Sequence, residues 1–299
     1  MDLYFLFDIV IMLIVAAVPL YLVQLYYRWS ELEAHAFRVL AAMSLVVIWG
    51  VVVYGSFIEP HRLVVHEQPV SIDSGSNSLK LVVISDPHLG RYRDDAWLLR
   101  IVRRINTLEP DAVVILGDLV DGRSGFMELE PLRELQTRLG TYAVLGNTDY
   151  YWGAVDVRHA VERYNVEVLT NEWVRLGEEG PILSGLDDIW NGTPDWLSAL
   201  VDAPEDVPVI MAVHNPDEAA RGDYMGVELM IAGHTHGGQI RLPLIGPVAG
   251  TPTTIDRKYD QGMFAFGDMN LFITSGVGES GVRSRLLNPP EIVQLNVSY

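Results

Sequence analysis

The segment 81–90 joins a run of apolar residues to a carboxylate and an imidazole, and it restricts the possible folds more than any other part of the chain. The five apolar or small residues at 81–85 predict a strand with both faces covered, as in the parallel sheet of an α/β layer fold. Asp86 and His88 follow on the same side of the strand end, where open α/β sheets place their sites. Taken alone, Asp86 could equally cap the next helix and His88 could be an ordinary polar residue.

Four further apolar runs end in the same way, and this repetition favours a functional site. Strands are predicted at 112–116, 142–145, 207–213 and 227–232. The side chains that follow them are Asp118, Asn147, His214, His234 and His236. Taken singly, Asn147 could be a turn residue and His214 a core histidine. The first three strands alternate with polar loops and helical segments, which predicts right-handed parallel crossovers.

Two helices and several further strands are expected between and after these runs. Apolar residues recur at helical spacing from Trp97 to Leu108, with Asp94-Asp95 as the cap and Pro110 just beyond the end. A second helix is predicted from the leucines at 129, 132, 135 and 139, with Gly140 as its stop. Strands are also expected around 63–66, 166–176, 271–274 and 291–297, and the last three should complete a second sheet.

The first 60 residues predict a hairpin of two membrane-spanning helices. The segment 9–27 is apolar apart from Gln24, and the segment 39–58 carries no charge. Each is close to the roughly 20 residues that cross a bilayer core. Trp29, Tyr26 and Tyr27 suit the membrane interface. A signal peptide or a pair of buried core helices is the alternative, but the chain start lacks the basic charge of a signal peptide.

The rest of the chain divides into a linker at 61–79, which is rich in turn residues, and a domain at 80–299. Arg28 and Arg38 in the hairpin loop weakly favour a cytoplasmic loop, and Arg62 beyond the second span nearly cancels this preference. The sequence therefore leaves the side of the membrane open.

The chain has a formal net charge of −18 and contains no cysteine. An acidic domain repels phosphate backbones, so we expect no nucleic-acid partner. The absence of cysteine excludes disulfides and cysteine-ligated zinc. Nothing in the sequence indicates an obligate protein partner, whereas the apolar hairpin indicates a lipid bilayer.

Seven side chains at the ends of five predicted strands form a candidate metal centre. They are Asp86, His88, Asp118, Asn147, His214, His234 and His236. Carboxylates, an amide oxygen and neutral imidazoles suit Mn, Fe or Zn. One ion could not use so many ligands, so we expect two divalent cations. Two cations about 3.5–4 Å apart can hold the attacking and leaving oxygens of a phosphoryl group and lower the pKa of a water molecule.

Five segments of this chain resemble, in order, the five motifs of the calcineurin-like metallophosphoesterases. They are Asp86-Pro87-His88, Gly117-Asp118, Gly146-Asn147-Thr148-Asp149, His214 and Gly233-His234-Thr235-His236. Segments 214–217, 234–239 and 285–291 resemble the membrane-anchored bacterial subgroup. The resemblance covers 80–299 and implies an α/β fold: a four-layer sandwich of two mixed β-sheets flanked by helices. Here a two-helix transmembrane hairpin would precede it, in the bacterial inner membrane.

The resemblance also implies a role for each residue. One metal ion would be held by Asp86, His88, Asp118 and His236. The other would be held by Asp118, Asn147, His214 and His234. The positions that the resemblance assigns to catalysis are Asp118, Asn147, Thr148 and His214.

Two positions depart from the family pattern. Pro87 replaces the usual leucine, which is not a ligand. Thr148 replaces a histidine that helps to protonate the leaving group, and a threonine is no acid at neutral pH. Relatives that cleave nucleotide-lipid pyrophosphates can also lack this histidine, since pyrophosphate cleavage has a good leaving group. Candidate substrate-binding side chains are Thr148, Arg91, Arg93, Arg283 and Arg285.

Together these features predict a membrane-anchored dinuclear phosphoesterase that hydrolyses a phosphodiester or pyrophosphate bond in a lipid-linked substrate. The most specific candidate is cleavage of a UDP-2,3-diacylglucosamine-type pyrophosphate, as in lipid A synthesis, which requires a cytoplasmic domain. A phospholipid or cell-envelope phosphodiesterase on the outer side is the alternative enzyme. A catalytically weak metal-binding scaffold is the alternative of another class, because Thr148 supplies no acid.

Overall fold

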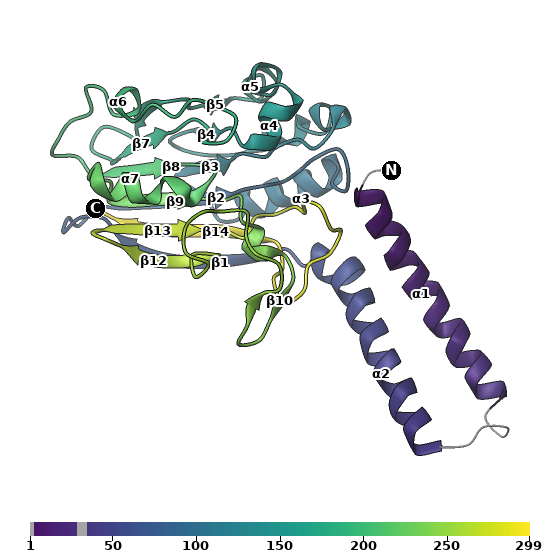
Figure 1. Ribbon diagram of the computed structural model, residues 1–299. Helices are drawn as coiled ribbons and strands as arrows, with labels where there is room; N and C mark the ends of the chain where they lie inside the picture. The colour runs from purple at the N-terminus through teal and green to yellow at the C-terminus, as the bar shows by residue number, and fades with distance from the viewer. Residues whose placement is uncertain (1–2, 29–34) are drawn as a thin grey trace.

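The computed structural model describes residues 3–28 and 35–299 and shows two N-terminal helices beside an α/β domain (Figure 1). The helices are α1 (Leu3–Tyr27) and α2 (His35–Val53). The second helix continues through a π-helical turn, η2 (Tyr54–Ile58), and a 3-10 turn, η3 (Glu59–His61), into the domain.

The domain is built on two six-stranded sheets. The first sheet has the order β1-β14-β2-β3-β4-β5. Its strands are β1 (Val64–Ser71), β14 (Glu291–Ser298), β2 (Ser78–Ile84), β3 (Ala112–Leu116), β4 (Thr141–Val144) and β5 (Val166–Val168). Strands β2 to β5 are parallel, as the alternation of strands and helices predicts, and β14 runs antiparallel to β2.

The second sheet has the order β12-β13-β9-β8-β7-β6. Its strands are β12 (Gly262–Phe266), β13 (Met269–Ile273), β9 (Leu229–Ala232), β8 (Val209–Ala212), β7 (Ile182–Gly185) and β6 (Glu172–Arg175). The four central strands are parallel and the two edge strands are antiparallel to their neighbours. A separate short hairpin consists of β10 (Arg241–Leu242) and β11 (Gly246–Pro247).

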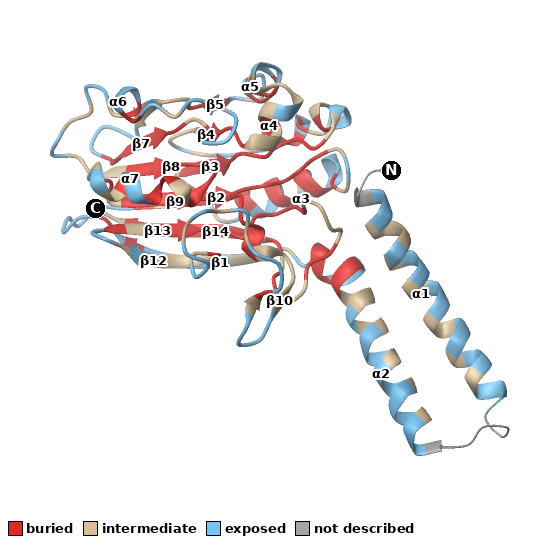
Figure 2. Cartoon of the chain, in the orientation of Figure 1, coloured by how far each residue is buried: buried red, intermediate tan, exposed pale blue. Residues whose placement is uncertain are grey.

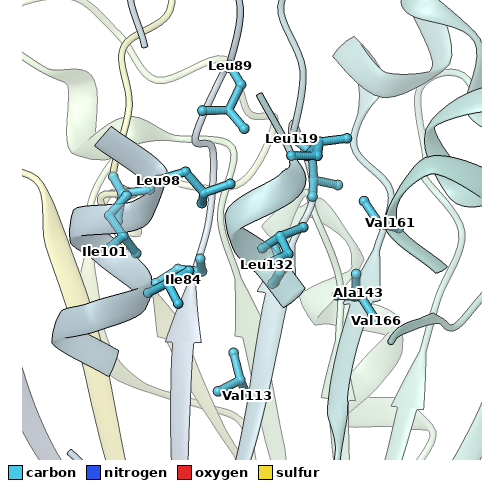
Figure 3. Packing of buried hydrophobic residues seen from close by; sticks show 14 of the residues in the cluster. Ile84, Leu89, Leu98, Ile101, Val113, Leu119, Leu132, Ala143, Val161 and Val166 are labelled. Carbon is cyan, nitrogen blue, oxygen red and sulfur yellow. The ribbon is translucent and has the colours of Figure 1, made fainter. Parts of the chain in front are cut away.

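Four layers result because alternate residues of a strand point to opposite faces of its sheet. Leu81 and Val83 of β2 pack between the two sheets, whereas Val82 and Ile84 pack under the helices. Figure 3 shows this outer cluster, in which Ile84 lies near Leu98 and Ile101 of α3. The outer face of the first sheet is covered by α3 (Asp95–Asn106), α4 (Asn147–Trp152) and α5 (Ala154–Glu162). Helices α6 (Trp196–Ala199) and α7 (Ala219–Tyr224) cover the second sheet, which confirms the predicted sandwich.

The second predicted helix is wrong. The region forms two 3-10 turns, η4 (Arg123–Phe126) and η5 (Glu130–Glu134). Pro131 lies at the start of η5, where its missing N–H is tolerated, but Leu135 is extended with ψ at 134°, so the helical path ends after η5. Leu129 and Leu132 are nevertheless buried in the core, which explains why their spacing suggested a helix.

The structure also differs from the prediction in the extent of the linker and in the sheet to which two strands belong. The segment 61–79, expected to be a linker, contributes β1, whose eight residues all pair with β14. Strands β5 and β14, expected in the second sheet, lie in the first. An apolar pattern identifies a buried strand, but it does not identify the neighbours of that strand.

The two N-terminal helices expose apolar side chains along most of their length. Figure 2 shows mostly exposed and half-buried residues on α1 and α2 until α2 reaches the domain. The segments Phe5–Tyr27 and Ala36–His61 have mean hydropathies of 2.6 and 2.3, and both are long enough to cross a bilayer. Trp49 Nε1 donates to the carbonyl of Val15 at 3.1 Å and joins the two helices. The connecting loop, including Trp29, lies outside the described residues.

Buried polar contacts fix the end of α2 to the domain. Glu59 is 1% exposed, and its carboxylate accepts hydrogen bonds from the backbone N–H groups of Leu287 at 2.9 Å and Asn288 at 2.7 Å. The backbone N–H of Arg285 donates to the carbonyl of Gly55 at 2.8 Å. The turn after α2 is therefore bonded to the segment just before β14.

Replacing Glu59 should destabilise the domain. In Glu59→Ala the buried N–H of Asn288 and the partly buried N–H of Leu287 lose their acceptor, which costs roughly 2–4 kcal/mol and should lower the melting temperature by about 5–10 °C. Glu59→Gln keeps one acceptor oxygen and should fall between this variant and the unmodified protein. Thermal unfolding of the full chain in detergent measures the effect, with Glu67→Ala on the exposed face of β1 as control. Equal melting temperatures for Glu59→Ala and Glu67→Ala would contradict this role.

Candidate metal centre

Five strand ends from both sheets bring the predicted metal ligands together. Strands β2, β3 and β4 of the first sheet and β8 and β9 of the second contribute them. The ligands are Asp86, His88, Asp118, Asn147, His214, His234 and His236, and all are buried except Asn147, which is half-buried. The sequence-based placement of the site at the carboxyl ends of parallel strands agrees with this geometry.

The backbone at these strand ends is held in conformations that most residues avoid. Asp86, His88, Asp118, His234 and His236 have φ between 45° and 66°, in the left-handed region. Such values cost free energy and occur mainly where the surrounding structure imposes them, often at functional sites.

The loops that carry the ligands also approach one another closely. Gly146 precedes Asn147, and a Cβ atom at this position would collide with the carboxylate of Asp118. Gly233 precedes His234, and a Cβ atom there would collide with Ser85. Glycine at these two positions therefore lets the metal-binding loops meet.

The first group of ligands consists of Asp86, His88 and His236. The Nε2 atoms of the two imidazoles lie 3.2 Å apart, and their rings stack with centroids 5.1 Å apart. Asp86 Oδ1 lies 3.4 Å from His236 Nε2 and has no hydrogen-bond partner within the described chain. Three potential ligand atoms therefore point at one position.

The second group consists of Asp118, His214 and His234, with Asn147 beside them. His214 Nδ1 donates to the carbonyl of Leu116 at 2.6 Å, and His234 Nε2 donates to the carbonyl of Pro252 at 3.0 Å. These bonds leave His214 Nε2 and His234 Nδ1 directed at each other, 3.1 Å apart. Backbone carbonyls commonly orient metal-binding histidines in this way.

Asp118 lies between the two groups. Its Oδ2 atom is 3.5 Å from His88 Nε2 of the first group and 3.5 Å from His214 Nε2 of the second. One carboxylate oxygen thus reaches both positions, which fits a ligand shared by two cations.

The burial and charges of these side chains favour a positive charge between their ligand atoms. Burial and the charge of His214 lower the pKa of His234 to about 3, and burial lowers that of His236 well below its ordinary value. Both rings are therefore neutral, the form that binds metal. Burial opposes protonation of His214, but the charge of Asp118 raises its pKa to about 10.

The donor set therefore fits two divalent cations. Each group offers a carboxylate and two imidazoles whose ligand atoms lie within 4.8 Å of one another. An uncompensated cluster of this kind, removed from water, would be strongly unfavourable. Oxygen and imidazole ligands without thiolates suit Mn, Fe or Zn.

Thr148 is bonded to the shared carboxylate. Its backbone N–H donates to Asp118 Oδ1 and its hydroxyl donates to Asp118 Oδ2, both at 2.8 Å. The threonine that replaces the expected histidine therefore orients a metal ligand in this structure. Its hydroxyl is already used, so a direct contact with substrate stays a prediction.

The arginines predicted to bind substrate occupy different environments. Arg285 is fully buried, and its guanidinium donates to the carbonyls of Ser275, Gly276, Gly278 and Asn288. Its predicted contact with an anionic substrate is therefore wrong, because backbone carbonyls use its donors.

Arg93 is likewise buried, in an ion pair with Glu279. Arg91 lies at the surface, with Nε 3.6 Å from Asp121 Oδ2, and Arg283 lies over the ring of Tyr92, 5.5 Å from its centroid. Arg91 and Arg283 are accessible, so their role as anion binders stays a prediction.

The loop that follows β7 also lines the site, although it was not predicted from the sequence. Trp190 places its ring edge-on to His234, with centroids 4.4 Å apart, and Asn191 Nδ2 donates to the carbonyl of Asn147 at 3.2 Å. Asp188 is buried, burial raises its pKa, and its Oδ2 has no hydrogen-bond partner in the described chain. The signal was present: an apolar strand followed by Gly185-Leu186-Asp187-Asp188 resembles the strand that precedes Asp118.

Several proteins that are similar in sequence to this chain are named as metallophosphoesterases. The chain is 30% identical over 250 residues to YkuE of Bacillus subtilis, an uncharacterized metallophosphoesterase. This match covers 80% of this chain and 87% of the relative. It is 29% identical over 270 residues to the uncharacterized metallophosphoesterase Cj0846 of Campylobacter jejuni, with 87% and 70% covered. A Bos taurus protein named transmembrane protein with metallophosphoesterase domain is 32% identical over 282 residues, with 87% of this chain and 62% of the relative covered.

The calcineurin-like phosphoesterase family matches residues 79–238, which include all seven proposed ligands. This region spans more than half of the chain. The chain therefore belongs to the calcineurin-like phosphoesterase family and is a phosphoester hydrolase.

Proposed function

We propose that this hydrolase is anchored in a membrane and cleaves a phosphodiester or diphosphate bond in a lipid-linked substrate. The observation that carries the two-metal chemistry is the position of Asp118 Oδ2, 3.5 Å from an imidazole of each ligand group. The observation that carries the membrane location is the pair of apolar helices joined to the domain through Glu59.

The chain's own residues position the reaction. Two bound cations would polarise the phosphoryl oxygens and lower the pKa of the attacking water. Asp118 sets the spacing of the two ligand groups, and Thr148 fixes both oxygens of that carboxylate. The carbonyls of Leu116 and Pro252 fix His214 and His234. Such preorganised charge stabilises a transition state without rearrangement during the reaction.

Membrane anchoring explains the exposed apolar surface of α1 and α2. Neither of the two most apolar windows has any share buried within the protein. Helices of this length and composition whose apolar side chains stay exposed are suited to solvation by lipid. For a bacterial chain this membrane is the inner membrane, and a site next to a bilayer suits an amphiphilic substrate.

The substrate class follows from Thr148, which cannot donate a proton at neutral pH. A diphosphate releases a phosphate leaving group that needs less protonation than an alkoxide. A UDP-2,3-diacylglucosamine-type diphosphate is the most specific candidate, and it places the domain on the cytoplasmic side. A phospholipid or cell-envelope phosphodiester would place the domain on the outer side.

Product analysis should identify a lipid-linked diphosphate as the preferred substrate. The full chain in bilayer nanodiscs, loaded with Mn²⁺, is incubated with lipid-linked diphosphates, phospholipids and a nitrophenyl phosphodiester, and product masses are measured. Asp118→Asn should lower turnover of every substrate about a thousandfold, because both cations depend on this ligand and supply several kcal/mol. Preferential cleavage of phospholipids would reject the diphosphate proposal, and full turnover by Asp118→Asn would reject the two-metal mechanism.

Metal analysis should find two divalent cations per chain. After loading with Mn²⁺ and removal of the excess, elemental analysis should give two ions per unmodified chain. His236→Ala removes a ligand of the first group and His234→Ala removes one of the second, so each variant should retain one ion. Asp156→Asn at the exposed surface of α5 serves as control and should retain two. A saturating value of one ion in the unmodified protein would contradict the dinuclear centre.

Removing the Thr148 hydroxyl should weaken metal binding. Thr148→Val keeps the side-chain volume but deletes the hydrogen bond to Asp118 Oδ2. Partners of metal ligands typically contribute 10- to 100-fold to metal affinity or activity, and we expect a loss of roughly that size in Mn²⁺ affinity. Thr148→Ser preserves the hydroxyl and should bind Mn²⁺ nearly as the unmodified protein does. Titration calorimetry compares the two variants, and equal affinities would show that the hydroxyl does not orient Asp118.

A further inference from the structure

A short hairpin beside the metal centre exposes large apolar side chains. It comprises β10, β11 and their connection, residues 240–248, and we call it the apolar hairpin. Leu244 at its tip is fully exposed, Ile245 is 67% exposed and Val248 is 55% exposed. Figure 2 shows the hairpin projecting away from both sheets with its tip exposed. Large apolar side chains gathered at one projecting tip indicate a contact with an apolar partner.

The apolar hairpin lies next to the turn that ends α2. The backbone N–H of Arg241 donates to the carbonyl of Leu286 at 2.9 Å, and the neighbouring Arg285 donates to the carbonyl of Gly55 in η2. A single segment of chain therefore separates the hairpin from the end of the candidate membrane helix. Figure 1 shows that the hairpin and α2 leave the domain on the same side.

Exposed apolar residues continue across the surface between these two elements. Leu287 in the separating segment is 55% exposed, and Phe57 and Ile58 in η2 are 38% and 48% exposed. The apolar surface of the anchor thus extends onto the domain and reaches the hairpin.

The charge pattern fits hydrocarbon as the partner. Between residues 237 and 255 the sole charged residue is Arg241, in a chain with a net charge of −18. Its guanidinium is bonded to the carbonyl of Gly237 and to Asp260, at 2.7 and 2.9 Å. The hairpin therefore presents no acidic group that anionic lipids would repel.

We propose that the tip of the apolar hairpin inserts into the membrane interface beside the anchor, as a second contact between the domain and the bilayer. This inference rests on the proposed membrane anchoring. Apolar side chains at the boundary of headgroups and acyl chains bind membranes in proportion to the apolar area they bury. A rigid domain joined to the bilayer at two places has a fixed orientation relative to it.

Both ends of the hairpin region contact the metal-binding loop, so this orientation also governs the site. The hairpin begins two residues after Gly238, in the loop that carries His236. Shortly after the hairpin ends, the carbonyl of Pro252 accepts the hydrogen bond from His234. Insertion of the tip therefore places the candidate metal centre next to the bilayer. A substrate can react there while its acyl chains remain in the membrane.

The absence of cysteine allows the test to use single-cysteine variants of the full chain. Leu244→Cys is labelled with the fluorophore NBD and placed in nanodiscs of phosphatidylethanolamine and phosphatidylglycerol, with or without brominated acyl chains. Leu197→Cys in α6, exposed on another part of the domain, is the matched control. Val47→Cys in α2 reports on the anchor itself.

The expected result is blue-shifted NBD emission at 244 that brominated lipid quenches, with emission typical of water at 197. Water-like emission at 244 together with quenching at 47 would overturn the hairpin contact while the anchor stands. Absence of quenching at 47 would overturn the anchoring and this inference with it. A blue shift at 244 that brominated lipid does not quench would identify a protein partner, such as a second copy of the chain, and would also overturn the proposal.

A second measurement distinguishes loss of the membrane contact from loss of catalytic activity. Leu244→Glu places a charge at the tip without touching the metal ligands, and should reduce turnover of a bilayer-embedded substrate on the order of tenfold. Turnover of a soluble nitrophenyl phosphodiester should not change. An equal loss on both substrates, or no loss on either, would contradict a role for the tip in presenting the site to the membrane.

Discussion

The structure depends most on the convergence of candidate metal-ligand atoms at the edge where the two sheets meet. Asp118 Oδ2 faces imidazoles from both groups at 3.5 Å, and the imidazoles within each group face one another at 3.1–3.2 Å. Bringing so many polar ligand atoms together away from water is costly, so the fold must hold them in place. Buried strands on both sides of the edge provide that rigidity.

The residues around the ligands fix them by hydrogen bonds that leave little freedom. Asp149 is buried and accepts from the backbone N–H groups of Leu119 and Val120, after β3, and of Gly146, after β4. One carboxylate therefore joins the loop of Asp118 to the loop of Asn147. Burial, and to a lesser extent the charge of Asp118, raises the pKa of Asp149 to about 7.

The sequence alone predicted the central strands and the candidate ligands at their ends, because each of these depended on a local pattern. Apolar runs followed by a carboxylate or an imidazole predicted the strands and the edge where Asp86, Asp118 and His214 meet. The spacing of leucines misled where the chain becomes extended at Leu135, since burial alone does not specify a helical path. Arg285 was misjudged because its partners are carbonyls, which every residue type presents. Sheet membership of β5 and β14 depends on long-range pairing, which no local pattern encodes.

The N-terminal helices and the candidate metal centre are connected through Asn288. Its backbone N–H donates to the carboxylate of Glu59 at 2.7 Å, and its side-chain amide donates to the carbonyl of His236 at 2.7 Å. One buried residue thus joins the turn that follows α2 to the backbone of a metal ligand. The segment from Glu59, upstream of β2, is therefore bonded to the domain. A soluble fragment that begins after Glu59 would leave the backbone donors of Leu287 and Asn288 without their acceptor and would loosen the residue that holds His236.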